Sequence, residues 1–260
     1  MYWVIQSNMY AEENYEHLLA ALDRFKLPYS VHKVVPFVGT LEPECNPPAG
    51  SVIVMGSTRL ARVAQERGWK PGSFLNENFD YFVQRKHWGR AMLNYHSITY
   101  KFGSVQKMFW EDKPFFIRPM DDSKAFAGMV TDWPSYVEWR DKVAKLTPED
   151  DPTLTLDTKV IVGPVMEIYR EYRLFVTDQR VVTASLYKIG SRPQSDATVE
   201  PAILAFGEEL AKKWSPAEAY AMDIADTPRG LKVIEVNNIN SAGWYKADMN
   251  KLVAALEEMW

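Results

Sequence analysis

The sequence has few of the residues that mark several common kinds of site. Cys45 is the only cysteine in 260 residues, so the chain can form no internal disulfide and no zinc cluster built on cysteines. A single cysteine suits a reducing compartment, and we expect a cytoplasmic protein. The four histidines all precede residue 100, which gives no support to a Ser–His–Asp or Cys–His mechanism.

Long apolar runs and an excess of positive charge are also missing. No stretch approaches the roughly 20 apolar residues that a membrane span needs, and the first residues lack the basic start of a signal peptide. The formal charge of -4 disfavours non-specific nucleic-acid binding. The sequence contains no Gly-x-x-x-x-Gly-Lys-Ser/Thr motif, so a P-loop enzyme is not predicted.

Apolar and aromatic residues are plentiful. Hydrophobic residues make up 47% of the chain, which includes 9 Trp, 13 Tyr and 12 Phe. Aromatic side chains contribute most when they are buried, so the composition predicts one compact body or two closely packed lobes with a large core.

The first hundred residues alternate between strand and helix patterns. Residues 3–6 form a short apolar run, residues 12–25 have helical spacing of apolar positions, and residues 29–35 return to a β-branched pattern. A buried strand at 51–55 precedes a helix at 58–67, with Ser57 as its expected N-cap. This order predicts an α/β lobe with a parallel sheet.

The rest of the chain mixes helices and strands. We expect helices at 82–93, 133–146, 202–214 and 246–259, and strands at 114–118, 159–162, 171–177, 180–188, 219–225 and 231–236. Asp178-Gln179 predicts a tight hairpin turn, and residues 226–230 predict the turn of a second hairpin.

The second hairpin carries the best candidate site. Side chains alternate along a strand, so Glu235 and Asn237 face the same side, and Asp223 lies on the partner strand. Two carboxylates and one amide are hard oxygen donors that suit Mg²⁺ completed by nucleotide phosphates. The alternative interpretation is a pair of ordinary polar positions on the outer face of a hairpin.

The order of the motifs gives a resemblance to a known family. Residues 223–225 followed by 233–237 look like the metal-binding end of the ATP-grasp superfamily, in which an Asp strand precedes a strand ending in Glu-x-Asn. Residues 167–176 and 181–187 are similar to its central strands. Residues 115–119, with Asp122, Lys124 and Phe126, resemble a phage and bacterial branch in which arginine replaces a phosphate-binding lysine.

This resemblance implies a fold, a reaction and two cofactors. Residues 1–100 would form the α/β lobe that precedes an α+β ATP-grasp fold at 101–260, whose two sheets clamp ATP with Mg²⁺. The implied reaction is ligation: a carboxylate takes the γ-phosphoryl group, an amine attacks the acyl phosphate, and ADP and phosphate leave.

The resemblance also implies residue roles. The expected metal ligands are Asp223, Glu235 and Asn237. The expected catalytic residues are Arg118, Arg173 and Arg192. The nucleotide is expected to contact Arg118, Lys124, Val165, Met166, Glu167, Glu171 and Arg173. The expected substrate contacts are Ser185, Tyr187, Lys188 and Asn240.

Other interpretations stay open from the sequence. A cross-strand salt bridge would explain Glu171 and Arg173 equally well, and only Gly128 lies in 120–130, so the glycine-rich phosphate loop of the superfamily is not evident around Lys124. A kinase on the same fold and a catalytically silent binding module are the competing functions. The sequence names neither the carboxylate nor the amine, which could be a small molecule, a peptide or a modified macromolecule, and it gives no oligomeric state.

Overall fold

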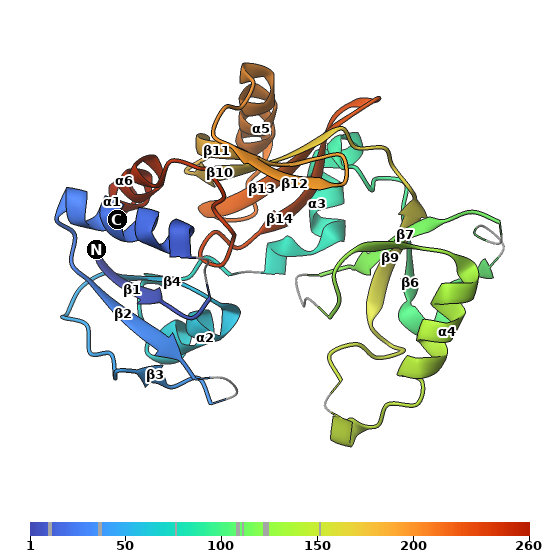
Figure 1. The fold of residues 1–260 in the computed structure, drawn as a ribbon, viewed down its shortest axis with the longest axis horizontal. Coiled ribbons are helices and arrows are strands. Elements are labelled where there is room, and N and C mark those ends of the chain that lie inside the picture. The colour runs from blue at the N-terminus through green and yellow to red at the C-terminus, as the bar shows by residue number, and fades with distance from the viewer. Residues whose placement is uncertain are drawn as a thin grey trace. The chain divides into compact units, whose positions relative to one another are not determined.

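The computed structural model describes residues 1–9, 12–35, 38–75, 77–107, 110, 112–121, 125–150 and 152–260. Its contacts divide the chain into two compact units, one formed by Met1–Glu77 with Ile168–Trp260 and the other by Asn78–Glu167 (Figure 1). The chain therefore leaves the first unit after residue 77 and returns to it at residue 168. The division into functional domains at residue 100 stays a prediction.

The first unit begins with the predicted α/β lobe. Its sheet has the order β3-β2-β1-β4-β5, and β1 pairs in parallel with both β2 and β4. The strands are β1 (Tyr2–Gln6), β2 (Tyr29–Val34), β3 (Leu41–Glu42), β4 (Val52–Met55) and β5 (Pro71–Gly72), and the helices are α1 (Glu12–Phe25) and α2 (Thr58–Glu66). The Ser57 hydroxyl accepts from the Leu60 N–H, which confirms the predicted N-cap.

The same unit holds an antiparallel sheet with the order β12-β11-β10-β13-β14. Its strands are β10 (Arg170–Thr177), β11 (Arg180–Ile189), β12 (Arg192–Asp196), β13 (Ala219–Thr227) and β14 (Gly230–Asn237), and its helices are α5 (Pro201–Lys213) and α6 (Met249–Glu258). Asp178 and Gln179 have φ of 46° and 62°, the left-handed values that a two-residue hairpin turn needs. Both predicted hairpins are confirmed.

The second unit is built on a four-stranded sheet with the order β6-β9-β7-β8. Its strands are β6 (Ile98–Lys101), β7 (Phe115–Pro119), β8 (Met129–Thr131) and β9 (Lys159–Pro164), and its helices are α3 (Tyr81–Trp88) and α4 (Trp133–Val143). The Asp132 carboxylate caps α4 by accepting from the Ser135 N–H at 2.9 Å. Short 3-10 helices occupy Glu77–Phe79, Gly89–Ala91, Phe102–Ser104 and Pro148–Asp150. No helix in the described part of the chain is long and apolar enough to cross a membrane.

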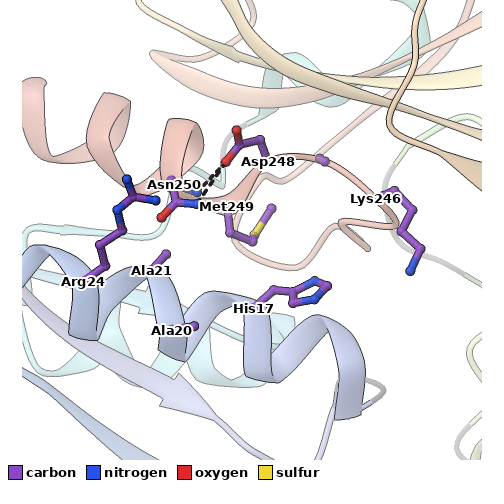
Figure 2. A pocket seen from close by; sticks show the side chains of 9 residues that line it. His17, Ala20, Ala21, Arg24, Lys246, Asp248, Met249 and Asn250 are labelled. Carbon is purple, nitrogen blue, oxygen red and sulfur yellow. Dashed lines mark hydrogen bonds between the residues drawn. The ribbon is translucent and has the colours of Figure 1, made fainter.

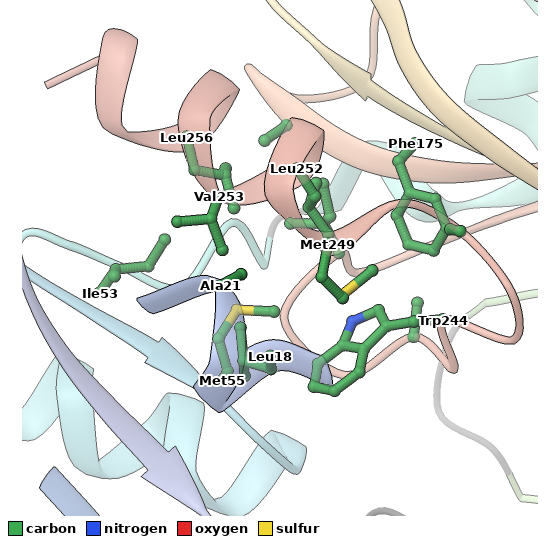
Figure 3. Close-up of a cluster of buried hydrophobic side chains, with 14 of the residues drawn as sticks. Leu18, Ala21, Ile53, Met55, Phe175, Trp244, Met249, Leu252, Val253 and Leu256 are labelled. Atoms are coloured by element: carbon green, nitrogen blue, oxygen red, sulfur yellow. The ribbon is translucent and has the colours of Figure 1, made fainter. Parts of the chain in front are cut away.

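The largest hydrophobic core joins the two sheets of the first unit. Leu18 of α1, Met55 of β4, Phe175 of β10 and Leu252 of α6 belong to one buried cluster, together with Trp244 from the loop before α6 (Figure 3). A second cluster buries the opposite face of the β1 sheet under α2. The first lobe is therefore a sheet covered on both faces, as expected for parallel strands.

Gly207 is the point of closest approach between α5 and the sheet. A Cβ atom added there would lie 2.2 Å from Leu174 Cδ2, and Leu174 is fully buried in β10. Alanine normally stabilises a helix interior relative to glycine, but here the methyl group must displace a packed side chain.

We therefore expect Gly207→Ala to lower the free energy of unfolding by about 1–3 kcal/mol, measured by urea denaturation. The control is Ala205→Gly at an exposed position of the same helix, which should also destabilise, by about 1 kcal/mol, through helix propensity alone. A Gly207→Ala protein more stable than the parent would contradict this close packing.

Candidate functional site

Three oxygen-bearing side chains meet on the β13–β14 hairpin. Asp223 pairs with Glu235 across the two strands, and Asn237 pairs with Ala221. The Asn237 amide nitrogen lies 3.4 Å from Asp223 Oδ2 and 3.3 Å from Glu235 Oε1. One point in space is thus within hydrogen-bonding reach of both carboxylates, as strand alternation predicts. Their role as metal ligands stays a prediction.

Asp223 is held by a buried arginine from the neighbouring strand. Arg173 of β10 pairs with Asp223 in the strand register and donates from Nε to Oδ1 and from Nη2 to Oδ2, each at 2.7 Å. The two residues are 9% and 2% exposed. A bidentate pair of this kind fixes both the position and the plane of the carboxylate.

Burial and charge act in opposite directions on this pair. Burial raises the pKa of the Asp223 carboxyl, and the Arg173 guanidinium counteracts the shift. Burial by itself would lower the pKa of Arg173, but the Asp223 charge outweighs it and the pKa is raised. Arg173 therefore stays positively charged at every physiological pH.

Two stacked tyrosines lie against the Arg173 guanidinium. The rings of Tyr187 and Tyr245 are 4.9 Å apart and 12° from parallel, and the Arg173 Cζ atom lies 5.6 Å from the first and 5.3 Å from the second. Arg173 Nη1 also donates to the Gly243 carbonyl oxygen at 3.3 Å. Sequence reasoning did not find Tyr245, whose φ of 52° sets a bend in the loop after β14.

Glu171 completes the cluster on the same sheet. The Tyr187 hydroxyl donates to Glu171 Oε2 at 2.7 Å, and Lys188 Nζ donates to Oε1 at 2.6 Å. Burial raises the pKa of the Tyr187 hydroxyl, and the charges of Asp223 and Glu171 act in the same direction, so the phenol stays protonated and remains the donor.

The cluster carries a small negative charge. Glu171, Asp223 and Glu235 supply three negative charges, and Arg173 and Lys188 supply two positive ones, which leaves a net charge of about -1 when all five are ionised. No group of three or more His, Cys, Asp or Glu side chains suited to a metal occurs in the described part of the chain. A site here would depend on the Asn237 oxygen as its third ligand, and an all-oxygen set of this kind fits Mg²⁺.

Several predicted nucleotide contacts lie elsewhere. Arg118 is 9% exposed in β7, an inner strand of the second unit's sheet. Val165, Met166 and Glu167 lie between β9 and β10, where the chain passes from the second unit back into the first. Lys124 lies outside the described residues. The roles of all five stay predictions.

The remaining predicted residues occupy three different settings. Arg192 is exposed on β12 and pairs in register with Ile189, so no contact recorded among the described residues joins it to the cluster. Ser185 is fully buried, and its hydroxyl accepts from the Lys246 N–H at 3.1 Å and lies 3.1 Å from the Asp196 carbonyl oxygen. The structure therefore uses Ser185 to position the loop before α6.

Asn240 connects the loop after β14 to the first sheet. Its Nδ2 donates to the Val54 carbonyl oxygen at 2.7 Å, and its Oδ1 accepts from the Phe74 N–H at 3.0 Å. The Asn240 carbonyl oxygen accepts from the Gly56 N–H at 2.8 Å. Asn240 is 1% exposed, so these bonds are made away from water and hold the two halves of the first unit in register.

The comparisons with known structures define the fold class. The chain is similar to a D-alanine–D-alanine ligase from Coxiella burnetii (12% identity, TM-score 0.64), covering 99% of this chain and 94% of the other. It is similar to a RimK domain ATP-grasp protein from Sphaerobacter thermophilus (14%, 0.62), covering 98% of each chain. It is also similar to the ATP-grasp ligase PsnB in complex with a minimal precursor (14%, 0.57), covering 99% and 98%.

These likenesses show that the chain has the ATP-grasp fold, an α/β lobe joined to sheets of α+β type. The model of the family described as ATP-grasp domain, R-to-K clade family 3, matches residues 32–256. The chain belongs to this family, which confirms the resemblance found in the sequence. No curated protein matches the chain.

Substitution of Asn240 separates its structural role from the predicted substrate contact. Asn240→Ala leaves a buried carbonyl oxygen of Val54 and a buried N–H of Phe74 without their partner. We expect the free energy of unfolding to fall by about 2–4 kcal/mol in urea denaturation. The control is Asn46→Ala, an exposed asparagine of the same unit, which should change stability by less than about 0.5 kcal/mol. Unchanged stability in Asn240→Ala would argue against the structural role.

Proposed function

We propose that this protein is a Mg·ATP-dependent ligase that joins a carboxylate to an amine through an acyl phosphate and releases ADP and phosphate. The observation that carries the proposal is the meeting of Asp223, Glu235 and Asn237 on one hairpin of a chain that belongs to an ATP-grasp family. The names of the structural neighbours, which are described as ligases, support the same reaction class.

The proposed metal site rests on the chemistry of its donors. Asp223 Oδ2 and Glu235 Oε1 converge on the position that the Asn237 amide nitrogen now fills, and rotation of that amide by half a turn would present its oxygen instead. When bound there, Mg²⁺ offsets the negative charge that develops on the phosphate oxygens.

Arg173 has a positioning role in this proposal. Three of its nitrogens donate to Asp223 and to Gly243, so the side chain orients the Asp223 carboxylate towards β14. A direct contact between Arg173 and the transferring phosphoryl group, which the resemblance also implies, remains a prediction. A positioning arginine fits the general requirement that metal-ligating carboxylates be held by further hydrogen bonds.

The other roles follow the family resemblance. Arg118 and Lys124 are proposed to neutralise the phosphates, the segment from Val165 to Glu167 to contact the adenine, and Glu171 to accept from the ribose. In the structure Glu171 accepts from Tyr187 and Lys188. Each of its two oxygens can accept a second hydrogen bond, so a ribose hydroxyl can be added without breaking the existing pair.

The role of Glu235 is tested by Glu235→Gln. For wild type at 100 times its Kd, Mg·ATP should stabilise by about 2.7 kcal/mol, which raises Tm by about 5–10 °C. We expect the variant to lose this shift and the turnover of ATP. Its ligand-free Tm should be equal to or above that of wild type, because the charge of Glu235 disfavours the neighbouring Asp223 carboxylate.

Glu209→Gln on the exposed face of α5 is the control and should retain the full shift. A Glu235→Gln protein that still turns over Mg·ATP would remove the metal site from the proposal. Wild type without any shift at millimolar Mg·ATP would favour a catalytically silent binding module.

The acyl phosphate distinguishes a ligase from a kinase. In this experiment the protein receives Mg·ATP, a panel of amino acids and short peptides as carboxylates, and hydroxylamine in place of the amine. Attack of the hydroxylamine nitrogen on the acyl phosphate expels phosphate and leaves a hydroxamate, which mass spectrometry detects together with ADP. We expect a hydroxamate to form with at least one carboxylate. Formation of ADP with a stable phosphorylated product and no hydroxamate would assign the protein as a kinase.

A further inference from the structure

A second candidate binding site lies on the first unit, between α1 and the start of α6. It is a groove with a volume of about 360 Å³. We call it the α1–α6 groove, and it is lined by His17, Ala20, Ala21, Arg24, Lys246, Ala247, Asp248, Met249 and Asn250 (Figure 2). The volume falls at the lower end of the range for small-molecule and peptide pockets.

The sequence of α1 creates this groove. His17, Ala20, Ala21 and Arg24 are spaced three, four and seven positions apart, so they share one face of the helix. The two alanines leave space between the longer side chains, and Ala247 and Met249 supply apolar surface from the other side. The result is a floor of small apolar residues with polar side chains along its length.

The charges along the groove are mainly positive. Arg24 lies at one end and Lys246 at the other, with His17 between them (Figure 2). Arg24 forms no ion pair with any residue that the structure describes. Two permanent cations against the single anion Asp248 give the groove a net charge of about +1, within a chain whose formal charge is -4.

The first turn of α6 is not the origin of this preference for anions. The Asp248 carboxylate caps the helix by accepting from the N–H groups of Asn250 and Lys251 at 2.9 and 3.3 Å. An incoming anion would have to displace this cap, so the cationic side chains are the attractive groups.

The groove adjoins the candidate active site through the backbone. Lys246 directly follows Tyr245, whose ring stacks on Tyr187 beside Arg173. The Lys246 N–H donates to Ser185 in β11, which fixes the start of the groove to the sheet that carries Asp223. A chain that leaves the reacting centre on this side can enter the groove without a gap.

We propose that the α1–α6 groove binds an extended acidic peptide, and that the acceptor substrate of the proposed ligase is therefore a peptide anchored outside the reacting centre. The spacing of the cations sets the pattern of the ligand. His17 and Arg24 are seven residues apart on α1, or about 10 Å. An extended peptide covers that distance in about three residues, so acidic side chains about three positions apart would pair with both ends.

A nucleic acid is a poorer match to the same surface. The groove contains no aromatic ring on which a base could stack, and its two permanent cations would neutralise few phosphates. The alanine floor favours short aliphatic side chains instead, whose burial adds to the charge pairing. The Asp248 carboxylate would also repel a continuous row of phosphates more strongly than spaced carboxylates.

The test is fluorescence anisotropy with a labelled eight-residue peptide that carries two glutamates three positions apart among alanines and leucines. The full chain should bind this peptide, and replacement of both glutamates by glutamine should weaken binding about tenfold or more. Arg24→Glu and Lys246→Glu should each weaken binding by a similar factor, because each reverses one charge of the groove. Arg62→Glu, an equal charge change at an exposed position of α2, should leave the Kd unchanged within twofold.

Three outcomes would overturn the inference: equal binding of the glutamate and glutamine peptides, equal weakening by Arg24→Glu and Arg62→Glu, or tighter binding of an eight-nucleotide oligothymidylate than of the acidic peptide. The inference depends on the proposed function only for its catalytic meaning, and the two fail separately. Wild type that shifts with Mg·ATP but does not bind the peptide rejects the groove alone. Wild type that binds the peptide but shows no Mg·ATP shift and no hydroxamate keeps the groove and rejects the ligase.

Discussion

The buried pair of Arg173 and Asp223 is the interaction on which the geometry of the candidate site depends. Two ionised groups removed from water are costly unless their hydrogen bonds are satisfied, and this pair meets that condition with two parallel bonds of 2.7 Å. The strand register makes the pair possible, because Arg173 on β10 lies opposite Asp223 on β13. The remaining guanidinium contacts reach Gly243 and the two stacked tyrosines, so one cation organises two strands and the loop that follows β14. Loss of either charge would leave the other buried and uncompensated.

The hairpin that carries Asp223, Glu235 and Asn237 is fixed to the rest of its unit at two levels. Below the sheet, Phe175 of β10 and Trp244 of the following loop belong to the same core as Leu18 of α1 and Leu252 of α6. Beside it, Asn240 binds main-chain groups of the first sheet, which lie more than 160 residues earlier in the sequence. Because a ligand set tolerates displacements of only a fraction of an ångström, such support is a physical requirement for a metal site on a surface hairpin. It also explains why polar residues in the loop after β14 are almost completely buried.

Local patterns were sufficient to predict the hairpins and the convergence of the three oxygen side chains. Asp178-Gln179 can adopt left-handed backbone conformations, and the alternation of Glu235 and Asn237 needs no tertiary information. The strand β12 escaped prediction because Arg192–Asp196 is exposed throughout and has no apolar alternation. Tyr245 and the structural role of Asn240 escaped for a different reason: both look like ordinary loop residues, and their partners are distant in sequence. The return of the chain to its first unit at residue 168 is likewise a property of long-range contacts.

Charge separates the two candidate binding regions of the first unit. The cluster around Asp223 has a net charge of about -1 and suits a cation, whereas the α1–α6 groove has about +1 and suits an anion. The backbone from Tyr245 to Lys246 is all that lies between the residues that border them. An acidic peptide would be repelled from the metal cluster in the absence of Mg²⁺ and drawn along the groove, so the same charge pattern that orients the peptide also favours binding of metal and nucleotide before the reacting carboxylate enters. Order of binding is in this way a consequence of the electrostatics of a single compact unit.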